Sequence, residues 1–449
     1  NEKFNSLISA DTLPDIVTLG WWENQVDEMI ERDMVYALNE LADQYEPAFW
    51  EVADQTVVDW YTRADGNIYC YPNSSYQPSD YEEHDNIGSQ QTFLVRKDIY
   101  EAIGSPDMTT PEGFAAAVKA AAAQFPMVDG KPLIPIGAQE FNETGCVSFD
   151  QHLQNFLAIP YERGGRYNDR YTDPEYIGWL KVFRELGAEG YLKEDIFIDQ
   201  RTQVQEKLAA GQYFCMIYQY TDIEETQKAL YANNPERIYL AVDGPRNSQG
   251  DDHVLPGTGI NGWTVTLISR NCEDPERAIR FLTYLMSEEG QRMTYLGVPG
   301  EMYDTIDGQP VVREEVARLM TTDRAEYDRI YGGNVAYWML QDNVAQMQWY
   351  PPLEPPMGQL EEWTYRYTNY LGQYEINFDI NSPEGDADRK IKLMWSTILP
   401  QLLLAPTEGE FDRIFNDFLV EREAMGYAEV LDESTRQMRA AKERLGMDN

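Results

Sequence analysis

The sequence has few positive charges and no long apolar run. It contains 36 Lys and Arg against 77 Asp and Glu, which gives a net charge of −41. A surface of that sign repels nucleic acid and anionic lipid, so neither is an expected partner. No run of 18 apolar residues occurs, so no transmembrane helix is predicted, and no secretory signal peptide is recognised. At 449 residues the chain is long enough for two or more domains.

Histidine and cysteine are also scarce, which limits metal and redox chemistry. The three histidines and four cysteines do not have the spacing of a zinc site. They are His84, His152 and His253, and Cys70, Cys146, Cys215 and Cys272. The even number of cysteines permits two disulfides or four reduced thiols. We expect no metal and no cofactor.

Calcium is not expected either, because it needs six to eight oxygen ligands. The segment from Gln124 to Lys131 has a single acidic side chain, Asp129, which is too few for a calcium loop before Pro132. The acidic stretch from Asp379 to Asp388 misses the spacing of an EF-hand, so it is interpreted as a solvated loop.

Catalytic signatures are missing as well. The sequence has no Gly-x-Ser-x-Gly, no P-loop and no dinucleotide-binding fingerprint. A glycoside hydrolase needs two carboxylates about 5 to 10 Å apart, and no motif selects such a pair. We therefore expect a protein that is not an enzyme, with glycoside hydrolase kept as the alternative.

Tyrosine and tryptophan are abundant, with 30 and 10 residues against 16 Phe. Both combine an apolar ring with a polar group, which suits half-wet surfaces. Sugars need such a surface, although a core rich in tyrosine would give the same composition.

The stretch from Val254 to Tyr303 has the clearest pattern. Its first part carries three glycines, and residues 263–267 then alternate as in a half-buried strand. Asp274 and Ser287 are good N-caps for two helices, the second ending near Gly297. The glycines are Gly257, Gly259 and Gly262.

Other strand–helix units follow the same logic. Ile16 to Leu19 is predicted as a buried strand of a parallel sheet, ending at Trp21 and Trp22. Ligands of open α/β sheets bind at the carboxyl ends of strands, so these tryptophans are candidates for ligand contact. Further strands are predicted at 92–96, 133–137 and 214–218, and helices from Thr110 and over 405–445.

These patterns resemble the extracellular solute-binding proteins of ABC importers. The resemblance rests on a glycine-rich segment ending in Trp263, then Asp274-Pro275-Glu276 with Ala278, then Ser287-Glu288-Glu289-Gly290. Gly297-Val298-Pro299-Gly300 with Tyr303-Asp304, and the segment from Ala10 to Val17, are also similar. The sequence is most similar to the subgroup of oligosaccharide binders that includes alginate-binding proteins and lipoproteins that bind sugars.

The resemblance implies an α/β fold of two hinge-linked lobes with the ligand cleft between them. The expected N-terminal lobe is 1–88 plus 257–345, without the first strand–helix–strand of the family. The expected C-terminal lobe is 89–256 plus 346–449. Three crossings are expected near 71–91, 254–262 and 340–350.

The resemblance also implies the function. We expect a monomeric, extracellular or periplasmic protein that is lipid-anchored in its full-length form. It would deliver an oligosaccharide to the permease subunits of an ABC transporter. A surface or sensor protein that binds glycan without a permease stays open. Because the candidate positions are aromatic, amide or acidic, neutral glycans are favoured over uronates.

Strand ends and resemblance together predict the residues that contact ligand. These are Trp21, Trp22, Glu23, Asn73, Tyr76, Gln139, Glu140, Tyr218, Gln219, Tyr220, Trp263, Tyr303, Trp338 and Trp349.

Overall fold

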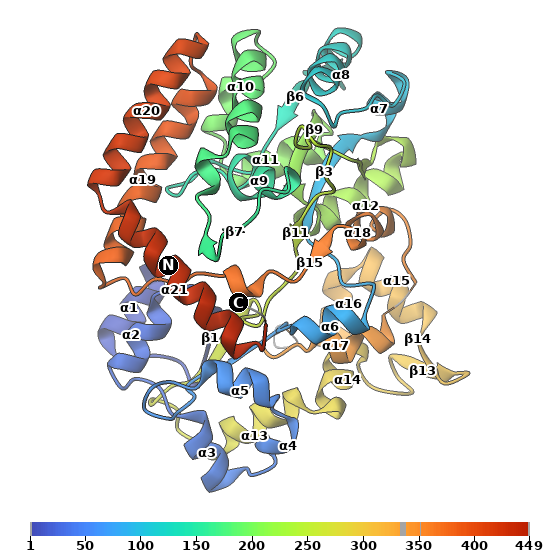
Figure 1. Cartoon of the computed structure of the whole chain (residues 1–449). Helices are drawn as coiled ribbons and strands as arrows, with labels where there is room; N and C mark the ends of the chain where they lie inside the picture. Colours follow the sequence, from blue (N-terminus) through green and yellow to red (C-terminus); the bar gives the residue numbers. More distant parts are fainter. Residues whose placement is uncertain (1, 333–337, 351, 448–449) are drawn as a thin grey trace. The chain divides into compact units, whose positions relative to one another are not determined.

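The structure, a computed structural model, describes residues 2–332, 338–350 and 352–447 (Figure 1). The chain forms two compact units. Unit 1 contains residues 1–80 and 258–352, and unit 2 contains residues 81–257 and 353–449. The chain therefore passes from one unit to the other three times. No described helix combines the length and the apolar character needed to cross a membrane.

Unit 1 is built on a three-stranded antiparallel sheet in the order β1-β12-β2. The parallel sheet predicted for the first strand is therefore wrong. The mostly apolar residues 16–19 suggested burial on both faces, but only Val17 of β1 is fully buried. The predicted half-buried strand is also more buried than expected, because all five residues of β12 are buried. The strands are β1 (Ile16–Gly20), β12 (Thr264–Ile268) and β2 (Tyr71–Pro72).

Thr266 shows how β12 tolerates a buried polar residue. The hydroxyl of Thr266 lies 2.9 Å from that of Thr18 on β1 and 3.1 Å from the carbonyl oxygen of Met339. A buried hydroxyl with partners does not carry the desolvation cost of an orphaned one. Alternation of Thr with apolar residues thus does not indicate a wet face in this strand.

The two helices after β12 begin where their caps predict. The side chain of Asp274 accepts from the backbone N–H of Arg277 at 3.0 Å. Ser287 likewise accepts from Gly290 at 3.1 Å, and Gly297 has φ 85°, a conformation that favours glycine. The helices of unit 1 include α13 (Pro275–Met286), α14 (Glu288–Leu296), α1 (Glu2–Ala10), α2 (Gln25–Glu31), α3 (Leu38–Tyr45), α4 (Phe49–Val52), α5 (Gln55–Tyr61) and α17 (Asn343–Gln346).

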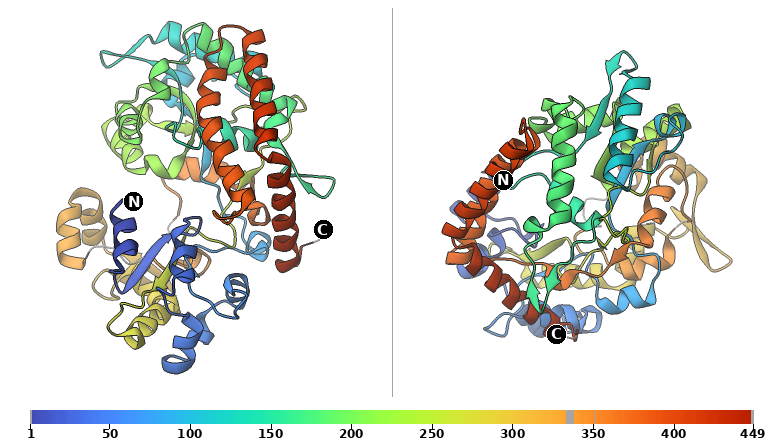
Figure 2. Two further views of the ribbon diagram at one scale, coloured as in Figure 1. Left: turned by 90° about the vertical axis from the view of Figure 1, so that its left-hand side faces the viewer. Right: turned by 45° about the horizontal axis from the view of Figure 1, so that its top comes forward.

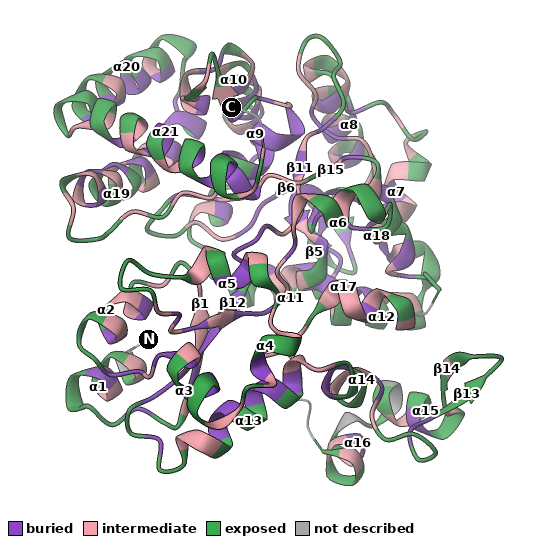
Figure 3. Cartoon of the chain, turned by 60° about the horizontal axis from the view of Figure 1, so that its bottom comes forward, coloured by how far each residue is buried: buried purple, intermediate pink, exposed green. Residues whose placement is uncertain are grey.

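A small hairpin and two helices follow α14. The hairpin is almost entirely exposed, and Tyr303 is its one buried residue (Figure 3). The helices pack on a small apolar cluster of Met302, Val316 and Tyr327. These elements are β13 (Tyr303–Ile306), β14 (Gln309–Val312), α15 (Glu314–Thr322) and α16 (Arg324–Tyr331).

Unit 2 contains a four-stranded sheet in the order β10-β3-β9-β6. Strand β9 pairs in parallel with β6 and antiparallel with β3, so the sheet is mixed. The predicted strands at 92–96, 133–137 and 214–218 are confirmed within one or two residues. The strands are β3 (Gln91–Arg96), β6 (Ile134–Gly137), β9 (Tyr213–Gln219) and β10 (Tyr239–Ala241).

Long helices complete unit 2, and the last three run at the C-terminal end of the chain (Figures 1 and 2). The prediction of a loop over Asp379–Asp388 is wrong from Pro383 onward, because α19 begins there with Ser382 as its N-cap. Glutamate and aspartate in a first turn favour a helix as readily as a loop. The helices include α19 (Pro383–Leu403), α20 (Glu408–Ala424), α21 (Tyr427–Arg444), α7 (Lys97–Ala102), α8 (Pro111–Gln124), α9 (Leu153–Phe156), α10 (Pro174–Ala188), α11 (Arg201–Ala209), α12 (Glu224–Asn233) and α18 (Gly358–Tyr365).

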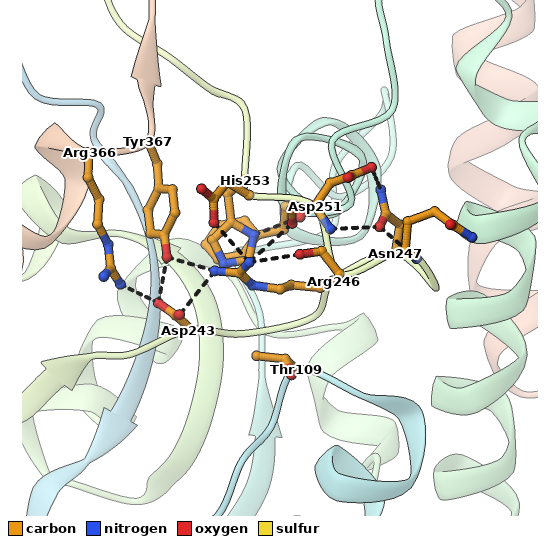
Figure 4. Close-up of polar contacts among 12 residues, drawn as sticks. Thr109, Asp243, Arg246, Asn247, Asp251, His253, Arg366 and Tyr367 are labelled. Atoms are coloured by element: carbon orange, nitrogen blue, oxygen red, sulfur yellow. Dashed lines mark hydrogen bonds and ion pairs between the residues drawn. The ribbon is translucent and has the colours of Figure 1, made fainter.

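A polar network in unit 2 holds the segment that leads to Gly257 (Figure 4). The carboxylate of Asp243 accepts hydrogen bonds from Tyr367 at 2.9 Å and Arg366 at 2.6 Å, and pairs with Arg246 at 3.1 Å. Burial opposes the charge of Asp243, yet the hydrogen bond from Tyr367 and the charge of Arg366 keep its pKa below the usual value. The network ties the chain after β10 to α18 and the residues that follow it.

The four cysteines are all free and buried. Of the two alternatives that the sequence left open, the structure has the four separate thiols.

Candidate functional site

An aromatic surface forms in unit 1 where β1 ends and β12 begins. Because these strands are antiparallel, Gly20 pairs with Thr264, which brings Trp21 and Trp22 next to Trp263. The backbone N–H of Trp21 donates to the carbonyl oxygen of Trp263 at 3.5 Å. Two segments more than 240 residues apart in the sequence thus present their tryptophans together.

The rings of this surface are unusually open to solvent. Trp22 is 49% exposed and Trp263 is 52% exposed. The ring of Trp263 lies 5.5 Å from that of Trp338, and Trp22 meets Trp21 edge-on at 5.9 Å. A Cβ atom on Gly20 would lie 2.7 Å from the Trp22 ring, so this ring lies against the backbone of β1. We call these four residues the tryptophan cluster.

Asn73 positions the tryptophan cluster from the end of β2. Its side-chain oxygen accepts from the backbone N–H of Thr264 at 2.7 Å, and its amide N–H donates to the carbonyl oxygen of Trp338. Its own carbonyl oxygen accepts from the N–H of Trp263 at 3.2 Å. Asn73 is 1% exposed, so the structure gives it a positioning role; direct contact with ligand stays a prediction.

A second amide residue, Asn261, connects α5 with the segment just before Trp263. Its side-chain oxygen accepts from the indole N–H of Trp60 at 2.7 Å, and its carbonyl oxygen accepts from the hydroxyl of Tyr61 at 3.0 Å. Gly262 follows with φ 68°, and a Cβ atom there would lie 1.9 Å from the carbonyl oxygen of Asn73. Only glycine fits this close approach of two backbones.

The remaining predicted residues of unit 1 are spread out. Glu23 is partly buried beside the tryptophan cluster, and Tyr76 is 7% exposed with its N–H on the carbonyl oxygen of Gly259. Tyr303 is buried in the hairpin, and Trp349 packs on Tyr295 with ring centroids 6.3 Å apart. No ring contact connects either one with the tryptophan cluster among the described residues.

Unit 1 also contains a pocket with a volume of about 160 Å³. Its walls include Asp54, Ser74, Ser75, Gln341 and Asp342. None of the predicted ligand residues lines it. The pocket is therefore separate from the surface that the tryptophans form.

The predicted residues of unit 2 meet at one edge of its sheet. Gln139 and Glu140 follow β6, and Tyr218 and Gln219 end β9. Because β6 and β9 are parallel, their carboxyl ends lie at the same edge. Gln219 donates to the side-chain oxygen of Gln90, and the N–H of Tyr220 donates to the carbonyl oxygen of Gln90 at 3.0 Å.

Three of these side chains carry buried polar atoms without a hydrogen-bond partner in the described structure. They are Oε1 of Gln139, Oε2 of Glu140 and the hydroxyl of Tyr218. An orphaned buried polar atom costs about 1–3 kcal/mol, so three at one sheet edge point to a ligand that satisfies them.

Arg201, the first residue of α11, lies between two carboxylates at this edge. Its guanidinium is 2.9 Å from Asp222 and 3.6 Å from Glu140. Burial raises the pKa of Asp222, and the charge of Arg201 opposes this rise. We call Gln139, Glu140, Arg201, Tyr218 and Asp222 the polar cluster of unit 2.

Another carboxylate, Asp150, lies deeper in unit 2. It accepts from the indole N–H of Trp395 at 2.7 Å and from the backbone N–H of Cys146 at 2.9 Å. Burial raises the pKa of Asp150 to about 7 although these donors oppose the shift. Among the described residues, no group of three or more His, Cys, Asp and Glu side chains is arranged to hold a metal ion.

Comparison with known proteins decides the family. The profile of the bacterial extracellular solute-binding proteins matches residues 1–300, about two thirds of the chain. The chain belongs to this family. The resemblance found in the sequence is thereby confirmed.

One curated relative of this solute-binding protein is the polygalacturonan/rhamnogalacturonan-binding protein YtcQ of Bacillus subtilis strain 168. It is 20% identical over 321 residues, which cover 70% of this chain. The match covers 61% of YtcQ. The chain thus spans about three fifths of the length of this relative.

Solved structures of the same fold cover nearly the whole chain. FusA, an ABC-transporter substrate-binding protein of S. pneumoniae solved with kestose, has a TM-score of 0.74 at 15% identity. The match covers 98% of this chain and 91% of FusA. The alginate-binding protein AlgQ2, solved without calcium ion, has a TM-score of 0.69 at 15% identity, covering 98% and 88%. The predicted periplasmic-binding-protein-like α/β fold is confirmed.

Sequence reasoning missed three residues of these sites. Trp60 lies on a helix whose pattern carries no ligand signal, and it reaches Asn261 only through tertiary contact. Arg201 opens α11 and Asp222 lies in the short turn after β9, and no motif marks either residue. The place of Asp222 just beyond a strand end is a signal that would have found it, whereas Arg201 reaches this edge only through the fold.

Proposed function

We propose that this solute-binding protein binds an oligosaccharide outside the cell and delivers it to the permease of an ABC importer. Family membership supports a binding role. The curated relative is named for binding polygalacturonan and rhamnogalacturonan, and FusA was solved with kestose. A monomer that is lipid-anchored in its full-length form is part of the proposal.

The tryptophan cluster is the observation that carries the carbohydrate proposal. Large apolar rings normally lose solvent contact on folding, yet Trp22 and Trp263 each keep about half of their surface exposed. The backbone of Trp263 is held by hydrogen bonds to Trp21 and Asn73. The Trp263 ring contacts Trp338 and the Trp22 ring contacts Trp21, so little entropy is lost when a ligand covers them. The C–H face of a sugar ring packs on such surfaces.

Neutral sugars fit the polar cluster of unit 2 better than acidic ones. Its one cation, Arg201, has two carboxylate partners, which leaves a net charge of −1 on the three side chains. The orphaned atoms of Gln139 and Glu140 are acceptors, and sugar hydroxyls are donors. A uronate carboxylate supplies no proton to them and is repelled.

Isothermal titration with a matched pair of trisaccharides tests this function. We expect saturable one-to-one binding of kestose and at least tenfold weaker binding of trigalacturonate. Chromatography of each mixture after long incubation should show intact sugars, whereas cleavage would favour the glycoside hydrolase alternative. A protein that binds neither sugar nor any member of a wider panel of oligosaccharides is not a carbohydrate-binding protein.

A further inference from the structure

In the polar cluster of unit 2, the positive charge of Arg201 is paired with two carboxylates. Arg201 is half-exposed, with 50% of its side chain open to solvent, so a ligand can reach it. Asp222 and Glu140 are more enclosed, with side-chain exposures of 17% and 24%. The arrangement places a reachable guanidinium beside two carboxylates that the fold holds in place.

Each carboxylate is supplied by a different element. Glu140 follows β6, Asp222 lies in the short turn after β9, and Arg201 opens α11. Because α11 leads directly into β9 and β9 pairs with β6, the three side chains converge at one edge of the sheet. The fold of the sheet and α11 therefore fixes the positions of all three side chains.

The orphaned atoms beside this ion pair are polar groups to which a ligand can hydrogen-bond. Gln139 is 8% exposed and Tyr218 is not exposed, yet each has a side-chain polar atom with no partner in the described structure. Buried polar groups are otherwise almost always satisfied. A ligand group close to Gln139 and Tyr218 would also lie close to Glu140 and Arg201.

We propose that Asp222 and Glu140 act as specificity-determining residues by occupying Arg201, so that the site rejects acidic sugars and accepts neutral ones. The inference rests on the proposed carbohydrate-binding function. A guanidinium with a free fork binds carboxylates in two-point contacts. With both carboxylates in place, that contact is already made within the protein, and an incoming uronate meets net negative charge.

Removing one carboxylate should therefore create affinity for uronates. Asp222→Asn deletes the partner at 2.9 Å while keeping the side-chain volume. We expect trigalacturonate to bind this variant at least tenfold more tightly than the wild type, and the ratio of trigalacturonate to kestose affinity to rise with it. The gain should shrink when NaCl is raised, because Arg201 is half-exposed and its charge is screened.

The matched control is Asp432→Asn. Asp432 pairs with Arg166 on the surface of unit 2, and these side chains are 67% and 63% exposed. This variant also frees an arginine and also removes one of the protein's negative charges. It should leave trigalacturonate binding unchanged, since neither residue belongs to the polar cluster.

Each outcome of the titrations has one meaning. If the wild type binds kestose and Asp222→Asn gains nothing for trigalacturonate, the inference is wrong and the proposed function stands. Equal gains in both variants would show a net-charge effect and would also overturn it. If no oligosaccharide binds the wild type, both proposals fail. Should Asp222→Asn unfold, Glu140→Gln must give a smaller gain of the same sign.

Discussion

Trp263 offers the sharpest test of the tryptophan cluster. It is 52% exposed, and a tryptophan side chain presents about 200 Å² in all, so about 100 Å² is available to a ligand. At about 25 cal/mol per Å², covering that surface contributes about 2.5 kcal/mol, or roughly seventyfold in affinity. Part of this gain is offset by ordering of the ligand. Trp263→Ala should therefore weaken kestose binding at least tenfold.

The assay is calorimetric titration of kestose into the folded variant. The buried half of the Trp263 ring contributes up to about 2.5 kcal/mol to stability by the same area, so urea unfolding must first show that the variant is folded. Trp50→Ala is the matched control. Trp50 is 39% exposed in unit 1, but it packs edge-on with Phe49 and donates to Asp43 at 2.8 Å.

The control should lose a comparable amount of stability and keep its affinity. Unchanged kestose binding by folded Trp263→Ala would refute the reasoning. It would mean that the half-exposed ring has only a structural role and that the sugar binds elsewhere.

Two further predictions concern stability. Gly262→Ala should lower the free energy of urea unfolding by at least about 3 kcal/mol, because its Cβ would lie 1.9 Å from a backbone oxygen. The control Gly66→Ala, with φ 85° and open space around it, should lower it by only about 1 kcal/mol. Equal losses in the two variants would contradict the close approach at Gly262. Since burial raises the pKa of Asp150 to about 7, the folded state binds the proton more tightly than the unfolded chain between pH 3.8 and 7. Stability should fall as pH rises through that window, by up to about 4 kcal/mol, and Asp150→Asn should make the slope between pH 5 and pH 8 in urea titrations clearly smaller.

Local signals in the sequence were sufficient for the helix starts. Asp274 and Ser287 cap the helices they were expected to cap, because an N-cap acts through hydrogen bonds within three residues. Thr110 behaves in the same way at the start of α8. The same locality explains the failure at Pro383, where acidic residues in a first turn are compatible with both loop and helix.

The partners and relative directions of the strands could not be predicted from such local signals. The direction of β1 relative to β12 depends on a segment about 250 residues away, and a short apolar run is similar in parallel and antiparallel sheets. Asn73 and Thr264 are likewise far apart in the sequence, by 191 residues. Sequence alone could propose that Asn73 and Trp263 belong to one site, but not that one positions the other.

The two clusters, each taken within its own unit, differ in the chemistry that they offer. The tryptophan cluster offers ring faces, while the amide groups of Asn73 and Asn261 beside it already have protein partners. The polar cluster offers unsatisfied acceptors and a neutralised cation. Ring faces stack on any sugar, so the tryptophans should set affinity without much selectivity. Acceptors and charges distinguish hydroxyl from carboxylate, so selectivity should reside in unit 2. Substitution of Trp263 should therefore weaken every oligosaccharide alike, whereas substitution of Asp222 should change their order.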